Sequence, residues 1–162
     1  MDLMDENLLN FWKALNNFGV DYIMVGGVAV NLHGYSRITK DIDVWVKDTK
    51  ENRRKLGFAF AEFGYDDINL EDFQFVPGWT AFYIGTGITL DILIKMVGLE
   101  EYSFDECLGF ASIAEIENIP VPFLHINQLI ANKRAVNRPK DQIDVMELEK
   151  IKKLREEMGL DN

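Results

Sequence analysis

Asp41 and Asp43 are the residues of this sequence whose spacing first suggests chemistry. They lie in the otherwise apolar segment DIDVWV (residues 41–46), which is typical of a β-strand. Side chains alternate between the two faces of a strand, so both carboxylates share one face, roughly 6.5–7 Å apart. Carboxylates at that separation can converge on metal ions, and Mg²⁺ favours such oxygens together with those of phosphates. A strand with one solvated face also carries acids, so the pair alone leaves both explanations open.

Asp91 is a third acid in an apolar segment, ITLDILIKM (88–96). If this segment forms a strand beside the first, three carboxylates meet on one face of the sheet. They would then repel one another and lose solvation, and a divalent cation would offset that cost. We therefore expect a metal site at the sheet surface, while a solvated strand face is the simpler explanation for Asp91 taken alone.

Gly26 and Gly27 follow the short apolar run YIMV (22–25), where a strand gives way to a helix. Without side chains they allow a phosphate to approach the backbone, and the N-terminus of the helix offers unpaired N–H groups to an anion. The alternative is a tight turn that requires positive φ angles. The sequence contains neither GxxxxGK[ST] nor GxGxxG in the required context, so a phosphate site here would be of another type.

The remaining pattern predicts the elements that position these residues. Helical spacing alternates with strand-like runs, and Pro and Gly mark their ends. The expected helices cover residues 6–17, 28–32, 50–62, about 102–107, 125–136 and 140–158, and the expected strands 22–25, 42–46, 73–76, 79–84, 88–96 and 119–123. The segments 79–84 and 88–96 are expected to pair antiparallel. This order predicts an α+β (mixed α/β) fold in a single domain, 1–162, with its core at about 20–124 and a C-terminal helical pair at about 125–160.

The composition suits a folded protein and limits its partners. The chain has 162 residues, 48% of them hydrophobic, and a formal net charge of −10. That average field disfavours free polyanions such as duplex DNA, but it is compatible with a local basic groove or with a nucleotide that arrives with its metal ion. Cys107 is the only cysteine, so an intrachain disulfide is excluded. The acidic N-terminus and the lack of a long apolar run predict a cytoplasmic protein with no membrane span.

Taken together, Gly26-Gly27, DID (41–43) and the later Asp91 resemble the motif of the nucleotidyltransferase superfamily of the DNA polymerase β type. Within it, the strings GYSRITKDID (34–43) and KRAVNRPKDQID (133–144) resemble small prokaryotic nucleotidyltransferases related to the toxins of type IV abortive-infection toxin–antitoxin pairs. The resemblance covers roughly residues 20–145. It implies a mixed sheet flanked by helices and in-line transfer of a nucleoside monophosphate from a nucleoside triphosphate (NTP).

The resemblance also implies a role for each motif residue. Asp41, Asp43 and Asp91 would be the catalytic residues and the ligands of two Mg²⁺ ions, and Asp91 could serve as general base as well. Gly26 and Gly27 would bind the phosphates of the NTP. The acceptor is left open between a tRNA end, a protein and a small molecule, and so is a toxin role with a partner antitoxin.

Basic residues are expected to complete the nucleotide site, because a triphosphate carries more charge than two metal ions neutralise. Arg37 and Lys40 precede the acids, and Lys133 and Arg138 lie on or just after a helix that could fold over the site. A solvated surface position is the alternative for each of them. Strand alternation points Lys40 away from Asp41, so we expect Arg37, Lys133 and Arg138 to bind the nucleotide.

Four further polar residues are expected to be structural. Asp141 would cap the final helix, and Asp144, one turn later, would pair with a base. His33 is expected to be packed or exposed and His125 to lie in a cap, since neither has a Cys or His partner at metal spacing.

Two other functions stay open at this point. A non-catalytic nucleotide- or protein-binding module on the same fold would retain the motif without turnover. A phosphate hydrolase with an Asp-x-Asp site would use the carboxylates, but it gives no reason for the glycine pair at this distance.

Overall fold

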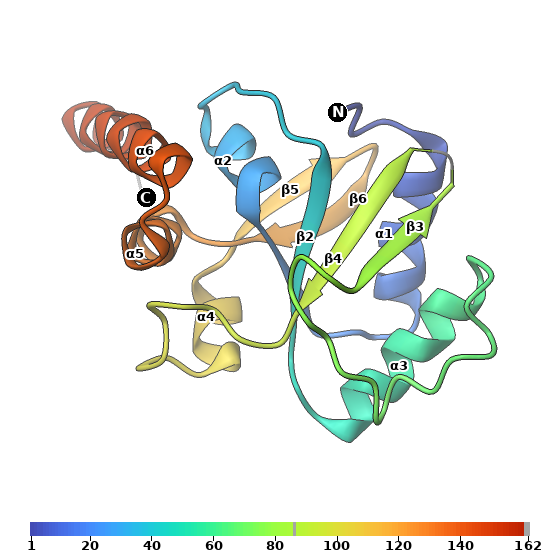
Figure 1. The fold of residues 1–162 in the computed structure, drawn as a ribbon. Helices are drawn as coiled ribbons and strands as arrows, with labels where there is room; N and C mark the ends of the chain where they lie inside the picture. The colour runs from blue at the N-terminus through green and yellow to red at the C-terminus, as the bar shows by residue number, and fades with distance from the viewer. Residues whose placement is uncertain (86, 161–162) are drawn as a thin grey trace.

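A mixed sheet lies at the centre of the computed structural model, which describes residues 1–85 and 87–160 (Figure 1). Within these residues the sheet has six strands in the order β3-β4-β2-β1-β6-β5. The strands β2 and β4 run parallel, as do β1 and β6, and the other neighbours are antiparallel. The strands are β1 (Tyr22–Val25), β2 (Asp41–Val46), β3 (Ala81–Ile84), β4 (Ile88–Leu93), β5 (Ser112–Ile116) and β6 (Ile119–Phe123).

Helices flank this sheet on both sides (Figure 1). The helix α1 packs against α3 and against β3 and β6, whereas α2 packs on β1 and β2 and contacts α5 and α6. The helices are α1 (Glu6–Asn17), α2 (Gly26–His33), α3 (Lys50–Ala61), α4 (Phe104–Phe110), α5 (Ile126–Val136) and α6 (Pro139–Glu157). The predicted α+β class with a mixed sheet and flanking helices is therefore confirmed.

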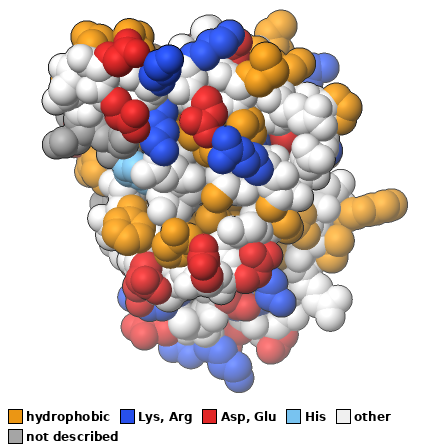
Figure 2. Space-filling model, turned by 90° about the vertical axis from the view of Figure 1, so that its left-hand side faces the viewer, with side chains coloured by type: hydrophobic (Ala, Val, Ile, Leu, Met, Phe, Trp, Pro, Cys, Tyr) orange, Lys and Arg blue, Asp and Glu red, His pale blue; other side chains and the backbone are white. Residues whose placement is uncertain are grey.

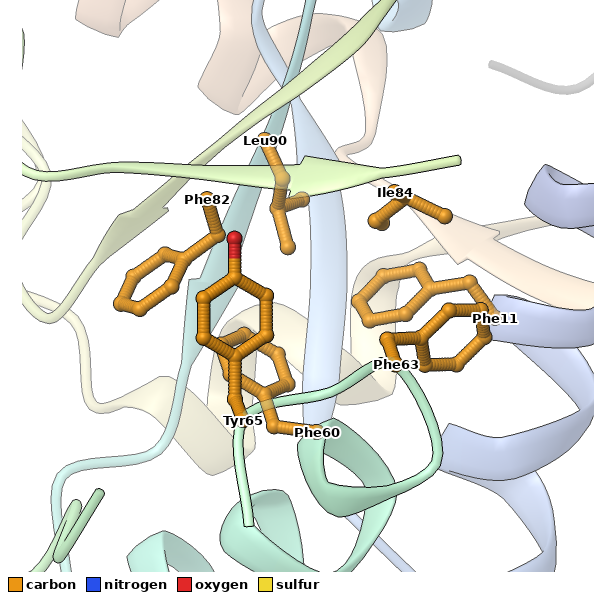
Figure 3. Close-up of a pocket in the computed structure, with 7 residues that line it drawn as sticks. All are labelled: Phe11, Phe60, Phe63, Tyr65, Phe82, Ile84 and Leu90. Carbon is orange, nitrogen blue, oxygen red and sulfur yellow. The ribbon is translucent and has the colours of Figure 1, made fainter. Parts of the chain in front are cut away.

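An aromatic cluster fills the space between the β3–β4 hairpin and the helices α1 and α3 (Figure 3). Phe82 and Leu90 point from the hairpin toward Phe11 and Phe60, and the cluster leaves no space for a water molecule. It is therefore part of the hydrophobic core. Because strand side chains alternate, Ala81, Tyr83 and Asp91 face the opposite side of the sheet.

The β3–β4 pair is antiparallel as predicted, with Ala81 opposite Asp91, but its strands are shorter than expected. The strand β3 begins at Ala81 and not at Trp79, because the backbone N–H groups of Trp79 and Thr80 both donate to the carbonyl oxygen of Val76 in a turn. At its other end β4 stops at Leu93 and does not reach Met96.

The strand predicted at 73–76 is wrong. Arg53 Nη1 donates to the carbonyl oxygens of Leu70 (3.2 Å) and Phe73 (2.6 Å), so an arginine side chain occupies carbonyls that a sheet ladder would need. The guanidinium of Arg53 also lies 5.1 Å from the ring centre of Phe75. The segment is therefore held in place by side-chain contacts.

The strand β5 was not predicted from the sequence. It joins β6 through Glu117 and Asn118, which both have positive φ angles of 49° and 66°. Two such residues form a tight hairpin turn, for which Asn-Gly or Asp-Gly is the usual signal. Glu-Asn is a much weaker signal, and the hairpin was missed for that reason.

Two helices differ from the prediction by two or more residues at an end, and three others by a single residue. The helix α4 begins at Phe104, because Ser103 caps it in a capping box with Glu106, and it continues to Phe110. The helix α2 begins at Gly26, two residues earlier than expected. No helix within 1–85 and 87–160 is long and apolar enough to cross a membrane.

Candidate active site

The register between β2 and β4 brings the three predicted acids to one face of the sheet. Asp43 lies directly opposite Asp91, and Asp41 lies opposite Thr89. The intervening residues of these strands, such as Ile42 and Leu90, are fully buried on the other face. Strands β2 and β4 are not consecutive in sequence, so the pairing depends on the parallel arrangement of the sheet.

The surroundings of Asp43 and Asp91 disfavour the charged forms of these two carboxylates. Burial, followed by the charges of Asp91 and Asp41, raises the pKa of Asp43 to about 6. The pKa of Asp91 is also raised, by burial and by Asp41, although the N–H of Gly78, 3.1 Å from Asp91 Oδ2, opposes the shift. The Oδ1 atom of Asp91 is buried and has no hydrogen-bond partner in the described part of the chain. The site therefore favours the approach of positive charge.

The glycine pair lies against these acids. Val25 is the register partner of Asp43, and Gly26 follows it with a φ angle of 70°. A Cβ atom at Gly26 would collide with the carboxylate of Asp43, and one at Gly27 would lie 2.7 Å from Thr39 Oγ1. Helix α2 starts here, and its N-cap residue Val25 makes no side-chain capping bond. Backbone N–H groups at this helix start can therefore bind an anion beside the acids.

The three cations predicted to bind the nucleotide lie near the site, but each is paired with an acid of α6. Arg37 Nε and Nη2 donate to the two oxygens of Asp144 at 2.8 and 2.9 Å. Lys133 is only 4% exposed, and its Nζ lies 3.2 Å from both Asp141 and Asp144. Arg138 Nε lies 2.6 Å from Asp141. These five residues are called the ion cluster below.

Acidic and basic side chains stand side by side over the upper part of the face that includes α5 and α6 (Figure 2). Asp141 also accepts a hydrogen bond from the backbone N–H of Arg138, as expected for a cap. Burial alone would raise the pKa of Asp141, but the bonds from Arg138 and the charge of Lys133 lower it to about 2. Asp141 and Asp144 therefore have the structural roles that the sequence predicted.

Two groups near the acids were missed. Lys140 is exposed near the start of α6, and its charge lowers the pKa of Asp43 against the effect of burial. Its sequence position, two residues after Arg138, could have indicated that Lys140 also lies near the acids. The N–H of Gly78 is a backbone donor brought to Asp91 by a turn, and no side-chain pattern could have indicated it.

Neither histidine belongs to the site. His33 is buried, and its Nε2 lies 2.7 Å from the carbonyl oxygen of Leu124, so it donates this bond as a packed, neutral side chain. His125 is the N-cap of α5, where its Nδ1 accepts a hydrogen bond from the N–H of Asn127. Both placements agree with the sequence prediction.

The acids fit a hard divalent cation in the type and charge of their oxygen atoms, and the unpartnered Oδ1 of Asp91 is available to such an ion. Among residues 1–85 and 87–160, however, no group of three or more His, Cys, Asp or Glu side chains is already arranged to hold a metal. A bound ion would therefore have to draw these carboxylates closer together.

A groove of about 480 Å³ opens beside Asp41. It runs between the N-terminal segment and the starts of β2 and β4. Its lining consists of Met1, Asp2, Asp5, Thr39, Lys40, Asp41, Gly87, Ile88 and Thr89. The groove gives a small molecule access to one of the three acids.

Comparison with known proteins identifies the fold. No family model and no curated protein sequence matches the chain. Among solved structures, the lincosamide antibiotic adenylyltransferase LnuA, crystallised with lincomycin, aligns over 91% of this chain and 97% of its own, with a TM-score of 0.59 and 16% identity.

Two further structures agree with this match. ANT(2″)-Ia in complex with adenylyl-2″-tobramycin aligns over 91% of this chain and 92% of its own, with a TM-score of 0.56 and 20% identity. A nucleotidyltransferase-like protein from Paracoccidioides brasiliensis aligns over 91% and 75%, with a TM-score of 0.57 and 16% identity. The chain has the fold of the nucleotidyltransferase superfamily.

Proposed function

We propose that this protein is a metal-dependent nucleotidyltransferase that transfers a nucleoside monophosphate from an NTP to an acceptor hydroxyl. The observation that carries the proposal is the pairing of Asp43 with Asp91 beside the uncapped start of α2 at Gly26. One face of the sheet thus combines carboxylates for a cation with backbone N–H groups for phosphates.

Each residue has a defined part in this proposal. Asp41, Asp43 and Asp91 would hold two Mg²⁺ ions, which supply positive charge to the triphosphate and to the attacking oxygen. The N–H groups at Gly26 and Gly27 bind phosphate oxygens. Arg37 lies over Gly27, with Nη1 only 3.2 Å from where a Cβ atom would be, so it can reach the same phosphates.

Lys133 and Arg138 complete the positive side of the nucleotide site. Both act electrostatically on Asp43 in this structure. Because Asp141 and Asp144 already neutralise part of their charge, phosphate binding would require these ion pairs to loosen or to share their donors.

The transfer itself conserves atoms and charge. The acceptor oxygen forms a bond to the α-phosphorus, the bond from that phosphorus to the bridging oxygen breaks, and pyrophosphate leaves with the electron pair. The hydroxyl proton would move to Asp91, the acid that this proposal assigns as general base.

Incubation with each α-labelled NTP and a host lysate tests the function directly. Wild type should label an acceptor and release pyrophosphate, whereas Asp43→Asn should not. The matched control Asp67→Asn, an exposed acid outside the site, should behave as wild type. Release of free phosphate or of nucleoside monophosphate alone would instead identify a hydrolase.

A non-catalytic nucleotide-binding module is the second candidate, and the pairing of all three predicted cations with acids favours it. In that case the protein would bind an NTP with no Asp43-dependent label on any acceptor. The toxin role and the antitoxin partner rest on the sequence resemblance alone, and both stay predictions.

A further inference from the structure

Two aromatic side chains are exposed beside the acids, on the strand at the edge of the sheet and in the turn that precedes it. Tyr83 is 60% exposed and lies opposite Thr89, and Ala81 lies between Tyr83 and the preceding turn, directly opposite Asp91. Both residues face away from the aromatic core shown in Figure 3, to which Phe82 and Ile84 belong. The small side chain of Ala81 leaves the space next to Asp91 open.

Trp79 precedes Ala81 and Tyr83 in the chain and is held by a turn with several hydrogen bonds. These three residues are called the aromatic row below. The N–H groups of Trp79 and Thr80 donate to the carbonyl oxygen of Val76 at 2.9 Å, and the N–H of Val76 donates to Thr80 Oγ1 at 2.9 Å. The N–H of the adjacent Gly78 binds Asp91. The indole itself is 87% exposed, in contrast to the buried Trp12 and Trp45. The turn thus fixes both Asp91 and a large aromatic surface that the core does not use.

This aromatic row lies on the far side of the acids from the glycine pair. The sheet order places β1, which ends at Gly26, next to β2, followed by β4 with Asp91 and then by β3. A triphosphate bound at Gly26 and Gly27 would therefore approach Asp43 from one side. The row of Trp79, Ala81 and Tyr83 lies where the other reactant would meet Asp91.

The charges beside the aromatic row limit the kind of acceptor that can bind there. The sheet face that carries Ala81 and Tyr83 also carries Asp41, Asp43 and Asp91, with Asp91 directly opposite Ala81. A phosphodiester backbone placed over this face would be repelled by these carboxylates.

The 480 Å³ groove continues the same surface. Thr89 lines the groove and is the register partner of both Tyr83 and Asp41. Asp2, Asp5 and Asp41 outnumber Lys40, the single basic side chain of the groove lining. A ring placed over Ala81 could therefore extend a neutral or cationic group into this groove.

We propose that Trp79, Ala81 and Tyr83 bind the acceptor, and that the acceptor is a neutral or cationic small molecule with a hydroxyl-bearing ring. The inference rests on the proposed function and specifies its substrate class. The indole and phenol rings would cover the apolar face of the ring, as aromatic side chains cover flat apolar groups elsewhere. The hydroxyl would then point to Asp91. A nucleic acid or protein acceptor would instead be detected as label in the RNA or protein fraction of the test below.

The test is the α-labelled NTP reaction in a host lysate, separated afterwards into small-molecule, RNA and protein fractions. The variants are Trp79→Ala, Trp79→Phe and Asp43→Asn. The control is Phe110→Ala, which removes another exposed aromatic, in α4. We expect Asp43-dependent label in the small-molecule fraction, reduced roughly fivefold or more by Trp79→Ala and retained in Trp79→Phe and Phe110→Ala. The affinity for Mg²⁺–NTP, measured by calorimetry, should be the same in wild type and Trp79→Ala, which excludes a general effect on folding or on the nucleotide site.

The outcomes separate this inference from the function on which it rests. Asp43-dependent label on RNA or protein, or small-molecule label that Trp79→Ala leaves unchanged, would overturn the acceptor assignment and leave the transferase standing. A reduced NTP affinity in Trp79→Ala would place the indole on the nucleotide and also overturn the assignment. A complete lack of Asp43-dependent label would remove the transferase and the acceptor assignment together.

Discussion

At the scale of single residues, Asp43 is where stability and function conflict. Its carboxylate is partly buried, faces Asp91 and Asp41, and touches the backbone at Gly26. Burial and the two neighbouring carboxylates make the free anion of Asp43 unfavourable, and the same carboxylates are what a cation needs from the site. We therefore interpret the strain as a property of the protein without its ligands, which metal and nucleotide would relieve.

The first prediction concerns Asp43→Asn in metal-free buffer. The pKa of Asp43 is about 6 in the folded protein, against 3.8 for an ordinary aspartate such as that of the unfolded chain, so ionisation destabilises the fold above about pH 6 and not below about pH 4. The variant should be more stable than wild type by roughly 2–3 kcal/mol at pH 8, as an upper value, and equal to it near pH 4. Urea unfolding at both pH values measures the difference, and equal stability at pH 8 would contradict the electrostatic account.

His33 gives a prediction of the opposite sign. Burial, followed by the charge of Arg155, lowers its pKa to about 4, while its bond to the Leu124 carbonyl opposes the shift. The neutral form is therefore needed for folding, and stability should fall as the pH drops from about 6.5 toward 4. His33→Gln, which keeps a donor for Leu124, should flatten that dependence. Unfolding midpoints at pH 7 and pH 4.5 test this, and parallel curves for both proteins would refute it.

At the scale of elements, the join between β1 and α2 has the strictest local requirement. Gly26 combines a φ angle of 70° with a contact that leaves no room for a side chain. We predict that Gly26→Ala destabilises the protein by roughly 1–3 kcal/mol and lowers NTP affinity, because the added methyl must displace Asp43.

The control is Gly57→Ala, within α3, where a Cβ atom would meet nothing within 4 Å. This change should stabilise the helix by up to about 1 kcal/mol. Thermal unfolding together with NTP titration of both variants is the measurement. A Gly26→Ala protein with wild-type stability and affinity would show that the glycine is not required.

The sequence predicted elements well where local signals agree with the fold. The strands at 22–25 and 42–46 and the antiparallel pair before and after Gly85 follow from apolar runs and turn residues. The prediction failed where a side chain distant in sequence determines the backbone conformation, as Arg53 does for residues 73–76. It also failed where a hairpin turn lacks its usual residues, as at Glu117 and Asn118.

For the candidate site, too, local sequence patterns predicted only part of the arrangement. Alternation in a strand predicted the common face of Asp41 and Asp43, but the pairing of Asp43 with Asp91 depends on a parallel register between strands that are distant in sequence. The pairing of Arg37 with Asp144, 107 positions apart, depends on how α6 docks, which no local pattern encodes.

At the scale of the whole molecule, the ion cluster joins the C-terminal helices to the loop that carries Arg37. Asp144 is buried and pairs with both Arg37 and Lys133, so its removal leaves two cations without that partner. We predict that Asp144→Ala destabilises the protein by roughly 2–4 kcal/mol, because breaking a buried ion pair costs far more than breaking an exposed one.

Glu149→Ala is the matched control, since it removes a half-exposed partner of Arg134 from the same helix. It should change the free energy of unfolding by less than about 0.5 kcal/mol. Hydrogen exchange of residues 35–40 should accelerate in Asp144→Ala alone. Equal effects of the two substitutions would mean that the cluster does not fasten α6 to the site.

The most direct test of the central claim is calorimetric titration of ATP, CTP, GTP and UTP into the protein with and without Mg²⁺. We predict that at least one NTP binds, that binding requires Mg²⁺, and that Asp43→Asn weakens it at least about tenfold while the protein stays folded and Asp67→Asn does not. NTP binding that is independent of both Mg²⁺ and Asp43, or no binding of any of the four, would contradict the account.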